Sequence, residues 1–369
     1  MMRKAAAALI VVLALLCASA GSAVAKVPHV NHVFIIVLEN ENAADTFGSG
    51  SPAPYLAQTL RSKGAFLPNY YAIGHLSLDN YIAMVSGQGP NGDTQSDCQF
   101  YNDFLPGTPT TNGQYTGQGC VYPAGVETIA NQLEGSGYTW KGYMEDMGTA
   151  CRHPAINSQD DTQTARLGDQ YAARHNPFVY FRSIIDFPTC GQNDVDFSRL
   201  STDLQLQSTT PNYSFITPNL CNDGHDSPCV DGRPGGLPTA DQWLQGNVPT
   251  ILNSPGFKDH GLLVITFDEA ESGPGGNADA SACCGEVSGP NTINPGGPTV
   301  GPGGGRVGAV LLSPCIKPGT TDKTPYNHYS LLRTVEGNFG LPYLGFARSP
   351  DPGAIGSAAL NNPPCNRRI

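Results

Sequence analysis

Beyond its first residues, the 369-residue sequence has no apolar run that approaches the roughly 20 residues needed to cross a lipid bilayer. It has no Cys-x-x-Cys pair, no Gly-x-Ser-x-Gly motif and no His-Glu-x-x-His motif, and no internal repeat is evident. These absences disfavour a thiolate zinc site, a nucleophile-elbow hydrolase and a zinc-helix protease.

Basic residues are also few, because 20 Lys and Arg stand against 31 Asp and Glu, a formal net charge of −11. An acidic surface argues against nucleic acid as a partner. It does not exclude a phosphorylated small molecule, because a bound metal ion can supply local positive charge.

Residues 1–25 have the charged, apolar and small-residue regions of a secretory signal peptide. We expect cleavage after Ala25, which leaves an exported, soluble protein with no stable membrane anchor. Strand patterns that we assign to one sheet occur at both ends of the remaining chain. We therefore expect residues 26–369 to form a single domain with long loops.

Ten cysteines follow the predicted signal peptide, an even number that indicates disulfides in an oxidising compartment. Their pairing cannot be deduced from irregular spacings, but we expect the adjacent Cys283 and Cys284 to bond different partners. Cys365 is expected to tie down the C-terminal tail.

Two short runs of β-branched and aliphatic residues are typical of strands buried on both faces. Residues 32–38 end on Glu39 and Asn40, and residues 261–267 end on Asp268 and Glu269. Ligands of open α/β sheets bind beyond the carboxyl ends of the strands, so these oxygen atoms can point into one site. Alone, Glu39 and Asn40 could simply cap a helix, but the repetition on a second strand favours a site.

Ser77 stands at the start of a helix that we expect to run through Met84. Helix capping alone would explain a serine at this position. A hydroxyl here is also well placed to attack phosphorus, because the helix amides and dipole favour a phosphoryl group beside them.

The rest of the chain alternates between helix and strand patterns. Residues 272–305 are rich in Gly and Pro and predict a long loop. Residues 303–308 fit the dinucleotide-binding pattern Gly-x-Gly-x-x-Gly, but a dinucleotide site needs this pattern to follow a strand and to begin a helix, and here a loop leads into a strand. Glu145 and Asp146 are interpreted as solvated turn residues, with a supporting role behind the site residues as the alternative. The other expected elements are helices over 53–63, 128–134 and 326–336 and strands over 138–144, 211–220 and 307–313.

Six motifs, taken in order, resemble the phosphoesterase family that joins bacterial phospholipases C with certain acid phosphatases. Leu76 and Asp79 depart from the residues common in that family. The likeness covers nearly all of the chain after the signal peptide. The motifs are Glu39-Asn40, His75-Leu76-Ser77-Leu78-Asp79-Asn80-Tyr81, His175-Asn176-Pro177-Phe178, Asn222-Asp223-Gly224-His225-Asp226, Thr266-Phe267-Asp268-Glu269 and Asn327 to Thr334.

This resemblance implies an alkaline-phosphatase-like α/β fold with a central, mostly parallel sheet flanked by helices, and a covalent phosphoenzyme mechanism. It assigns one divalent metal ion to Glu39, Asn40, Ser77, Asp268 and Glu269, with Ser77 also the nucleophile. An all-oxygen set suits a hard ion such as Mg²⁺, Ca²⁺ or Mn²⁺ better than zinc. Coordination would lower the pKa of the hydroxyl, so Ser77 need not depend on a histidine base.

The resemblance also implies roles for two histidines and two further residues. His175 and His225 match histidines that approach the phosphoryl oxygens, where imidazolium donors stabilise the transition state and one protonates the leaving oxygen. Such a role favours mildly acidic pH. Asn80 is expected to bind a phosphoryl oxygen or to orient Ser77, and His328 either binds substrate or packs near the site.

The predicted function is a secreted, metal-dependent phosphoesterase that hydrolyses phosphate monoesters through a phosphoserine, in the manner of an acid phosphatase. The alternative enzyme is a phospholipase C that cleaves phospholipid phosphodiesters, although the chain ends soon after Asn327 and His328, where such enzymes carry extra domains. A non-catalytic exported binding protein on the same fold is the alternative from another class. Activity insensitive to a chelator would instead indicate a Ser-His-Asp hydrolase.

Overall fold

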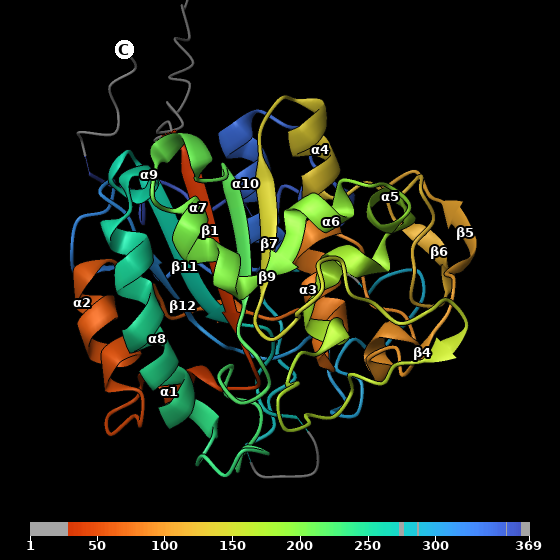
Figure 1. Cartoon of the computed structure of the whole chain (residues 1–369), viewed down its shortest axis with the longest axis horizontal. Helices are drawn as coiled ribbons and strands as arrows, with labels where there is room; N and C mark the ends of the chain where they lie inside the picture. Colours follow the sequence, from red (N-terminus) through yellow and green to blue (C-terminus); the bar gives the residue numbers. More distant parts are fainter. Residues whose placement is uncertain (1–28, 273–276, 286–287, 352, 363–369) are drawn as a thin grey trace, which may run out of the picture.

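A computed structural model describes residues 29–272, 277–285, 288–351 and 353–362, so the predicted signal peptide and Cys365 lie outside it. An eight-stranded sheet stands at the centre, in the order β13-β2-β12-β11-β1-β10-β7-β9 (Figure 1). β12 runs antiparallel to both of its neighbours, and the other neighbouring pairs are parallel. This confirms the predicted mostly parallel sheet. The strands are β1 (His32–Leu38), β2 (Ala65–Leu67), β7 (Trp140–Met144), β9 (Asp194–Asp196), β10 (Tyr213–Thr217), β11 (Gly261–Phe267), β12 (Ala309–Leu312) and β13 (Thr320–Thr321).

The central strand β1 is buried along its whole length, as its apolar sequence predicts. It lies between β10 and β11, and all three strands are parallel. In Figure 1 β1 and β11 both run downward, so their carboxyl ends lie at the same edge of the sheet. The residues that follow these strands therefore meet at that edge.

Helices cover the two faces of the sheet. Phe34 of β1 packs on Phe257 of α9, with ring centroids 6.5 Å apart. Phe215 of β10 packs on Tyr81 of α3 at 6.1 Å. Phe215 is paired with Ile35, the residue after Phe34, and successive residues of a strand face opposite sides. α9 and α3 therefore cover opposite faces.

Most predicted helices are present with similar limits. The helix expected at 53–63 is a π-helical segment, Tyr55–Leu60, followed by α2. The long α8 was not predicted, because Gly246 and Pro249 inside it interrupt the helical pattern. The α-helices are α1 (Ala43–Phe47), α2 (Arg61–Lys63), α3 (Ser77–Ser86), α4 (Ile129–Gly135), α5 (Arg182–Ile185), α6 (Cys190–Asn193), α7 (Leu200–Asp203), α8 (Gly236–Asn253), α9 (Pro255–Lys258) and α10 (His328–Phe339).

Short strands outside the main sheet form three pairs. β14 (Tyr326–Asn327) pairs with β3 (Tyr70–Tyr71), β4 (Phe100–Tyr101) pairs with β8 (Ser158–Gln159), and β5 (Leu105–Pro109) pairs with β6 (Tyr115–Gln118). The pair of β14 and β3 matters most for the site, because it joins the chain just before α10 to the chain just before α3.

The predicted Gly/Pro-rich loop is confirmed, since the described residues between 272 and 305 contain no helix or strand. The loop packs against the segment that leads into α3. The amide of His75 donates to the carbonyl of Pro295 at 3.0 Å, and the amide of Ala72 donates to that of Gly305 at 2.9 Å. The loop therefore braces the chain just before Ser77.

Four disulfides join described residues: Cys98–Cys120, Cys151–Cys190, Cys221–Cys229 and Cys283–Cys284. The prediction that the adjacent Cys283 and Cys284 bond different partners is wrong, because they bond each other. The chain turns at Cys284 and Gly285, and a turn inside an irregular loop leaves no periodic signal in the sequence.

Candidate active site

The site begins where β1 ends. Val33, Ile35 and Val37 of β1 lie on the face covered by α3, and the same alternation puts the next side chain, Glu39, on that face. Glu39 is fully buried. Its neighbour is Asp268, whose amide donates to the carbonyl of Leu38 at 2.8 Å and so continues the pairing of β1 with β11. Two carboxylates thus lie side by side at the carboxyl edge of the sheet.

Ser77 is the first residue of α3 and points at Glu39. Its Oγ donates to Oε2 of Glu39 at 2.9 Å, in a buried environment. The helix end is satisfied by another residue, because the amide of Leu78 donates to Oδ1 of Asp97 at 3.0 Å. The capping explanation for Ser77 is therefore not what the structure shows. The same contact means that Asp97 already occupies the amide of Leu78, which we expected to be available to a phosphoryl group.

The two predicted catalytic histidines share one carboxylate that sequence reasoning did not assign. Oδ2 of Asp223 lies 3.3 Å from Nδ1 of His175, and Oδ1 of Asp223 accepts the amide of His225 at 2.8 Å. Nε2 of His175 lies 3.4 Å from Oε1 of Glu39. The loop 221–226 contains Cys221, Asn222, Asp223, His225 and Asp226, and this density of residues able to bind a metal or phosphate is the signal in the sequence for Asp223.

The two histidines differ in charge preference. Burial lowers the pKa of His175 well below its usual value, so the neutral ring is favoured and not the expected imidazolium. Burial alone would also lower the pKa of His225, but a hydrogen bond with Asp226 at 2.9 Å and the charge of Asp223 raise it overall. The side chain of His225 is 35% exposed against 2% for His175, so His225 is the better proton donor to an arriving ligand.

Asn80 and His328, which were predicted to contact substrate, form hydrogen bonds with neighbouring groups of the protein. The amide group of Asn80 bonds the backbone of Ile73, Gly74 and Leu76, at 2.8 to 3.1 Å. This geometry favours the second alternative, in which Asn80 orients the segment that carries Ser77. A phosphoryl contact of Asn80 stays a prediction.

His328 is held in the same way. Its Nδ1 lies 3.1 Å from the hydroxyl of Tyr70, and its Nε2 lies 2.6 Å from the carbonyl of Asp268. Burial lowers the pKa of His328 to about 4, so the ring is neutral and joins α10 to the carboxyl end of β11. Packing near the site, the second alternative for His328, is the one that these contacts favour.

Asn40 and Glu269 complete the metal set predicted from the resemblance. The amide of Asn40 donates to Oδ1 of Asp268 at 3.1 Å, and Oδ1 of Asn40 is buried without a hydrogen-bond partner. Glu269 is fully buried and contacts Nδ1 of His75. His75 was not predicted as a site residue, although it lies two positions before Ser77 in the motif.

Several oxygen atoms around Ser77 are buried and unsatisfied within the described residues. They are Oδ1 of Asn40, Oδ2 of Asp223, Oδ2 of Asp268 and both carboxylate oxygens of Glu269, and both carboxylate oxygens of Asp79, two residues after Ser77 in α3, are in the same state. Burial first, and then the neighbouring carboxylates, raise the pKa of Glu39 and Asp79 well above their usual values. Buried charged oxygens without partners are costly, and a hard divalent cation is the ligand that would satisfy them. The residues present therefore fit such an ion.

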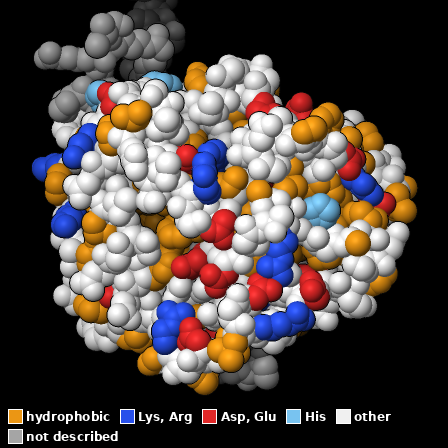
Figure 2. All heavy atoms as spheres, in the orientation of Figure 1, with side chains coloured by type: hydrophobic (Ala, Val, Ile, Leu, Met, Phe, Trp, Pro, Cys, Tyr) orange, Lys and Arg blue, Asp and Glu red, His pale blue; other side chains and the backbone are white. Residues whose placement is uncertain are grey.

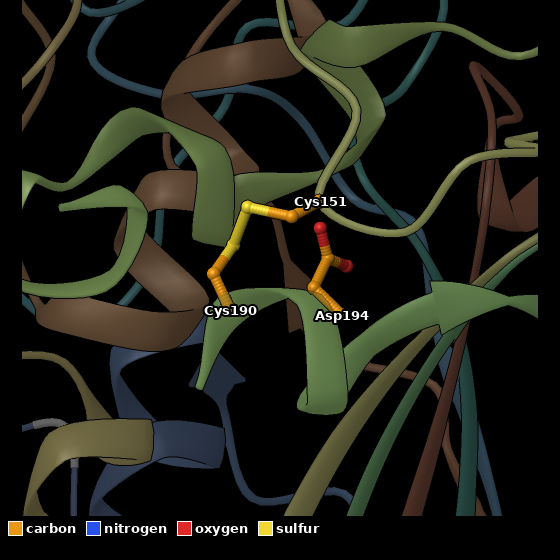
Figure 3. Close-up of side chains that lie close together, drawn as sticks. All are labelled: Cys151, Cys190 and Asp194. Atoms are coloured by element: carbon orange, nitrogen blue, oxygen red, sulfur yellow. A yellow bond between two sulfur atoms is a disulfide. The ribbon is translucent and has the colours of Figure 1, made fainter. Parts of the chain in front are cut away.

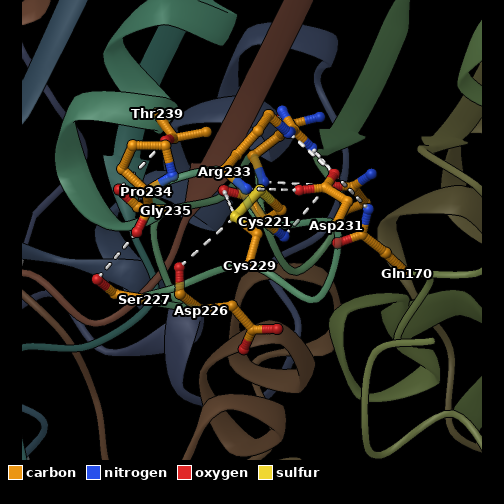
Figure 4. Close-up of a disulfide and its surroundings, with 12 residues drawn as sticks. Gln170, Cys221, Asp226, Ser227, Cys229, Asp231, Arg233, Pro234, Gly235 and Thr239 are labelled. Atoms are coloured by element: carbon orange, nitrogen blue, oxygen red, sulfur yellow. Dashed lines mark hydrogen bonds and ion pairs between the residues drawn. A yellow bond between two sulfur atoms is a disulfide. The ribbon is translucent and has the colours of Figure 1, made fainter. Parts of the chain in front are cut away.

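Three clusters in the described residues bring metal-binding groups within 4.8 Å of one another. One is Glu39, His175 and Asp223, at the site. The second is Cys151, Cys190 and Asp194, and Figure 3 shows the Asp194 carboxylate beside the disulfide of the two cysteines. The third is Cys221, Cys229 and Asp231 (Figure 4). Sulfur in a disulfide is not a thiolate ligand, so of the three only the first cluster lies at the candidate site, where it shares Glu39 with the predicted oxygen ligands.

The two disulfide clusters nevertheless support the site. Oδ2 of Asp194 accepts the side-chain amide of Asn176, next to His175, at 2.8 Å. The guanidinium of Arg233 bonds Asp231 and also donates to Oδ1 of Asn222, next to Asp223, at 2.7 Å. Each cluster therefore anchors the residue beside a site residue.

Glu145 has a similar supporting role, contrary to its interpretation as a solvated turn residue. Its Oε2 accepts the amide of Asn219 and the side chain of Asn222, both at 2.9 Å, and its Oε1 accepts Nε1 of Trp243 at 3.1 Å. The carboxylate is half-buried and bonds the 219–222 loop. Asp146, which follows it, is exposed as predicted.

The described surface agrees with the acidic composition. On the face drawn in Figure 2, Asp and Glu side chains are interleaved with Lys and Arg across the lower half. Among the described helices, none combines the length and the apolar character that a membrane span requires.

The fold and the site therefore define an α/β protein in which a serine that begins a helix faces buried carboxylates at the carboxyl edge of a mostly parallel, helix-flanked sheet. The chain belongs to the Phosphoesterase family, whose model matches residues 53–342. This confirms the resemblance to the family, and five of the six motifs lie within the matched residues, whereas Glu39-Asn40 precedes them.

Relatives of known name agree with this assignment. A phosphate-repressible acid phosphatase of Penicillium chrysogenum is 29% identical over 289 residues, which cover 78% of this chain and 54% of that protein. A phosphatidylinositol-3-phosphatase of Mycobacterium tuberculosis is 27% identical over 332 residues, which cover 90% of this chain and 84% of that protein. The chain spans between half and three fifths of the fungal acid phosphatases it matches.

Solved structures share the fold. A putative sulfatase from Bacteroides thetaiotaomicron has a TM-score of 0.51 at 12% identity, over 91% of this chain and 75% of that one. A protein in the alkaline phosphatase superfamily from Vibrio parahaemolyticus has a TM-score of 0.48 at 12% identity, over 85% and 69%. The match to the sulfatase, together with the mostly parallel sheet flanked by helices, confirms the predicted α/β fold class.

Proposed function

We propose that this protein is a phosphoric ester hydrolase that cleaves phosphate monoesters, in the manner of an acid phosphatase, with Ser77 as the nucleophile. The observation that carries the proposal is the buried 2.9 Å hydrogen bond from Ser77 Oγ to Glu39, at the start of a helix and among carboxylates with unsatisfied oxygens. Membership of the Phosphoesterase family and relatives named acid phosphatase support it.

Ser77 would attack phosphorus and form a phosphoserine, which water then hydrolyses. The hydrogen bond from Ser77 to Glu39 gives the hydroxyl proton a path to Oε2 during the attack, and the bond from phosphorus to the leaving oxygen breaks in the same step. Asn80 keeps the preceding segment in place by bonding the carbonyl of Leu76 at 3.0 Å. The bond from Ser77 to Glu39 and the bond from Asn80 to Leu76 together fix the orientation of the nucleophile.

Glu39, Asn40, Ser77 and Asp268 would hold one hard divalent cation such as Mg²⁺, Ca²⁺ or Mn²⁺, and Glu269 completes the set that the family motif indicates. When bound, the ion supplies positive charge that lowers the pKa of the hydroxyl and attracts the phosphate. The oxygen-only donor set and its buried, unpartnered atoms support a hard ion over zinc.

His225 is the proposed general acid. Its ring is partly exposed, bonded to Asp226 and favoured in the charged form, so it can give a proton to the leaving oxygen. His175 is buried with one ring nitrogen facing Glu39 and the other facing Asp223, and would help to hold these two carboxylates beside the phosphoryl group. A protonated His225 supports activity at mildly acidic pH.

A phospholipid is the second candidate substrate. The observation that favours it is the relative named phosphatidylinositol-3-phosphatase, of which the match covers 84%. That name describes a phosphate monoester on a lipid head group, so the same monoester chemistry would apply. It gives less support to the phospholipase C alternative, in which a diester is cleaved.

Hydrolysis of p-nitrophenyl phosphate from pH 4 to 9, with and without EDTA, tests the proposal. Ser77→Ala should lower kcat/KM by at least about a thousandfold, because the nucleophile is lost. The matched control is Ser86→Ala on the same helix, whose buried hydroxyl bonds the carbonyl of Ile82, and it should keep activity within about threefold. Activity that survives Ser77→Ala, or that EDTA leaves intact, would sink the metal-serine mechanism.

We also propose that the protein is exported after cleavage behind Ala25 and that residues 26–369 form one domain. Four disulfides between described residues support an oxidising compartment. N-terminal sequencing of protein collected outside the expressing cell should begin at Lys26, and limited proteolysis should yield no stable half. Retention of residues 1–25 would contradict the proposed processing.

A further inference from the structure

Tyr81 lies one helical turn after Ser77 on α3, so the two side chains project from the same face of the helix. Both donate to the same carboxylate, but to different oxygens. Ser77 donates to Oε2 of Glu39 at 2.9 Å, and the Tyr81 hydroxyl donates to Oε1 at 2.5 Å. Tyr81 and Ser77 therefore each bond one oxygen of the Glu39 carboxylate.

The ring of Tyr81 makes a second contact with the site. It stacks on His175 with centroids 5.4 Å apart and planes only 10° from parallel. Its other neighbour is Phe215 of the central sheet, in an edge-on arrangement at 6.1 Å. Tyr81 is fully buried, so the sheet fixes the tyrosine ring and the tyrosine ring fixes the plane of His175.

We propose that Tyr81 is a positioning residue of this site: its hydroxyl occupies Oε1 of Glu39, which leaves Oε2 for Ser77 and the ion, and its ring aligns His175. The proposal rests on the phosphoesterase function proposed above and adds a residue to it. Tyr81 acts through Glu39 and His175, so it need not touch the substrate.

If Tyr81 only filled space in the core, it would not need these contacts. A buried tyrosine needs an acceptor for its hydroxyl, but any carbonyl of the core would serve. Here the acceptor is a carboxylate that also accepts from the nucleophile and lies 3.4 Å from His175. Loss of the hydroxyl would free Oε1 to turn toward His175 or the ion, and Glu39 would then have no fixed orientation. Partners of this kind, one step behind a metal ligand, commonly set metal affinity.

The test compares Tyr81→Phe with Tyr143→Phe in the mature, disulfide-bonded protein. Tyr143 is a matched control, because it is fully buried and its hydroxyl also donates to a carboxylate, Asp203, at 2.9 Å. That carboxylate bonds Lys141 on β7. Binding of Mn²⁺ is measured by titration calorimetry, and kcat and KM are measured with p-nitrophenyl phosphate at saturating Mn²⁺.

Tyr81→Phe should weaken Mn²⁺ binding by about 10 to 100-fold and lower kcat with little change in KM. Tyr143→Phe should leave both within about twofold, even where it costs similar thermal stability. Tyr81→Leu, which also removes the ring from His175, should lower kcat by roughly a further factor of ten. Equal Mn²⁺ affinity and kcat in Tyr81→Phe and Tyr143→Phe would overturn the proposal.

A double-mutant cycle with Glu39→Gln assigns the effect to this carboxylate. In the Glu39→Gln background, Tyr81→Phe should change Mn²⁺ affinity by less than about twofold, and an undiminished effect would overturn the assignment to Glu39. Should Tyr81→Phe fail to fold, a fluorotyrosine at position 81, whose more acidic hydroxyl is a stronger donor to Oε1 of Glu39, should change Mn²⁺ affinity more than a fluorotyrosine at position 143. If the wild-type protein neither binds Mn²⁺ nor hydrolyses the ester, the proposed function itself is wrong. If the wild type is active but Tyr81→Phe changes neither Mn²⁺ affinity nor kcat, only this inference is wrong.

Discussion

The cluster of Glu39, His175 and Asp223 and the cluster of Cys221, Cys229 and Asp231 contain similar kinds of residue at similar separations. They differ in what already occupies their ligand atoms. In the second cluster the sulfurs are bonded to each other and Asp231 is paired with Arg233 (Figure 4). In the first, Oδ2 of Asp223 is buried without a hydrogen-bond partner.

The protonation of the two aspartates shows the same contrast. Hydrogen bonds from Arg233 lower the pKa of Asp231 to about 2, so it is charged and satisfied at the surface. Burial raises the pKa of Asp223, and the nearby charges of His225 and Arg174 only partly oppose this. Closely spaced ligand-type residues therefore indicate a metal site only where the protein itself leaves their atoms unsatisfied.

The largest expected difference is between Asp268→Asn at the site and Asp231→Asn at the disulfide. Asp268→Asn removes one negative charge from the proposed ligand set, so kcat/KM should fall by roughly a thousandfold, with weaker Mn²⁺ binding. Asp231→Asn should leave both unchanged within about twofold. Steady-state kinetics and calorimetry on the two variants check this, and similar losses in both would erase the distinction between the clusters.

Chelation and reduction should act on different clusters. An ion at 100 times its dissociation constant stabilises the native protein by about 2.7 kcal/mol, so EDTA should lower Tm by several degrees and abolish activity. Added Mn²⁺ or Mg²⁺ should restore both. A reductant without a chelator should lower Tm but leave the Mn²⁺ dissociation constant of the still-folded protein unchanged. Scanning calorimetry with each additive alone provides the measurement, and a Tm indifferent to EDTA would contradict it.

The Cys221–Cys229 bond should contribute stability without holding a metal. Replacing both cysteines by serine should lower the free energy of unfolding by about 2 kcal/mol, because a short loop is no longer closed in the unfolded chain. Ion stoichiometry should stay the same. Urea unfolding and metal analysis of the double variant test this, with Cys98→Ser/Cys120→Ser as the matched pair away from the 221–226 loop. Loss of bound ion only in the 221/229 variant would assign that cluster a metal role.

A buried acid in the scaffold should produce the smallest effect, a pH-dependent one. Burial raises the pKa of Glu336 in α10 to about 9, above the unfolded value of 4.5, while the amide of Leu344 donates to Oε1 at 2.8 Å. The folded protein therefore holds a proton that the unfolded chain releases, and stability falls as pH rises from 4.5 toward 9. Glu336→Gln should remove about 1 kcal/mol or more of that decline between pH 5 and 8.

Urea unfolding of wild type and Glu336→Gln at pH 5 and at pH 8 measures this effect. The two proteins should differ little at pH 5, and the variant should be the more stable at pH 8. An equal difference at both pH values would show that the carboxyl is charged in the native state.

The strands and the acids at their ends could be predicted from sequence, because strand burial leaves a run of apolar residues and the acids follow directly. Glu39 and Asp268 meet where that pattern places them. The histidine roles were less accessible. Whether a ring nitrogen faces a ligand or the backbone depends on the partner that the fold supplies, such as Tyr70 and the carbonyl of Asp268 for His328.

Other features had no local signal. Contacts between distant segments decide that Glu269 meets His75 and that Asp97 caps α3 in place of Ser77. The bond between Cys283 and Cys284 depends on the shape of an irregular loop. Position in the motif pointed to His75 and Tyr81 only as neighbours of Ser77, and their partners could be seen only in three dimensions.

The central position of β1 has a consequence for the order of folding. Its two neighbours begin about 180 and 230 residues later in the chain, at Tyr213 and Gly261. Contacts over such separations form slowly, so β1 has to wait unpaired until most of the chain is present. A ribosome-bound fragment that ends before β11 lacks Asp268 as well as one edge partner of β1. We expect the ion to be acquired only after the complete chain has folded.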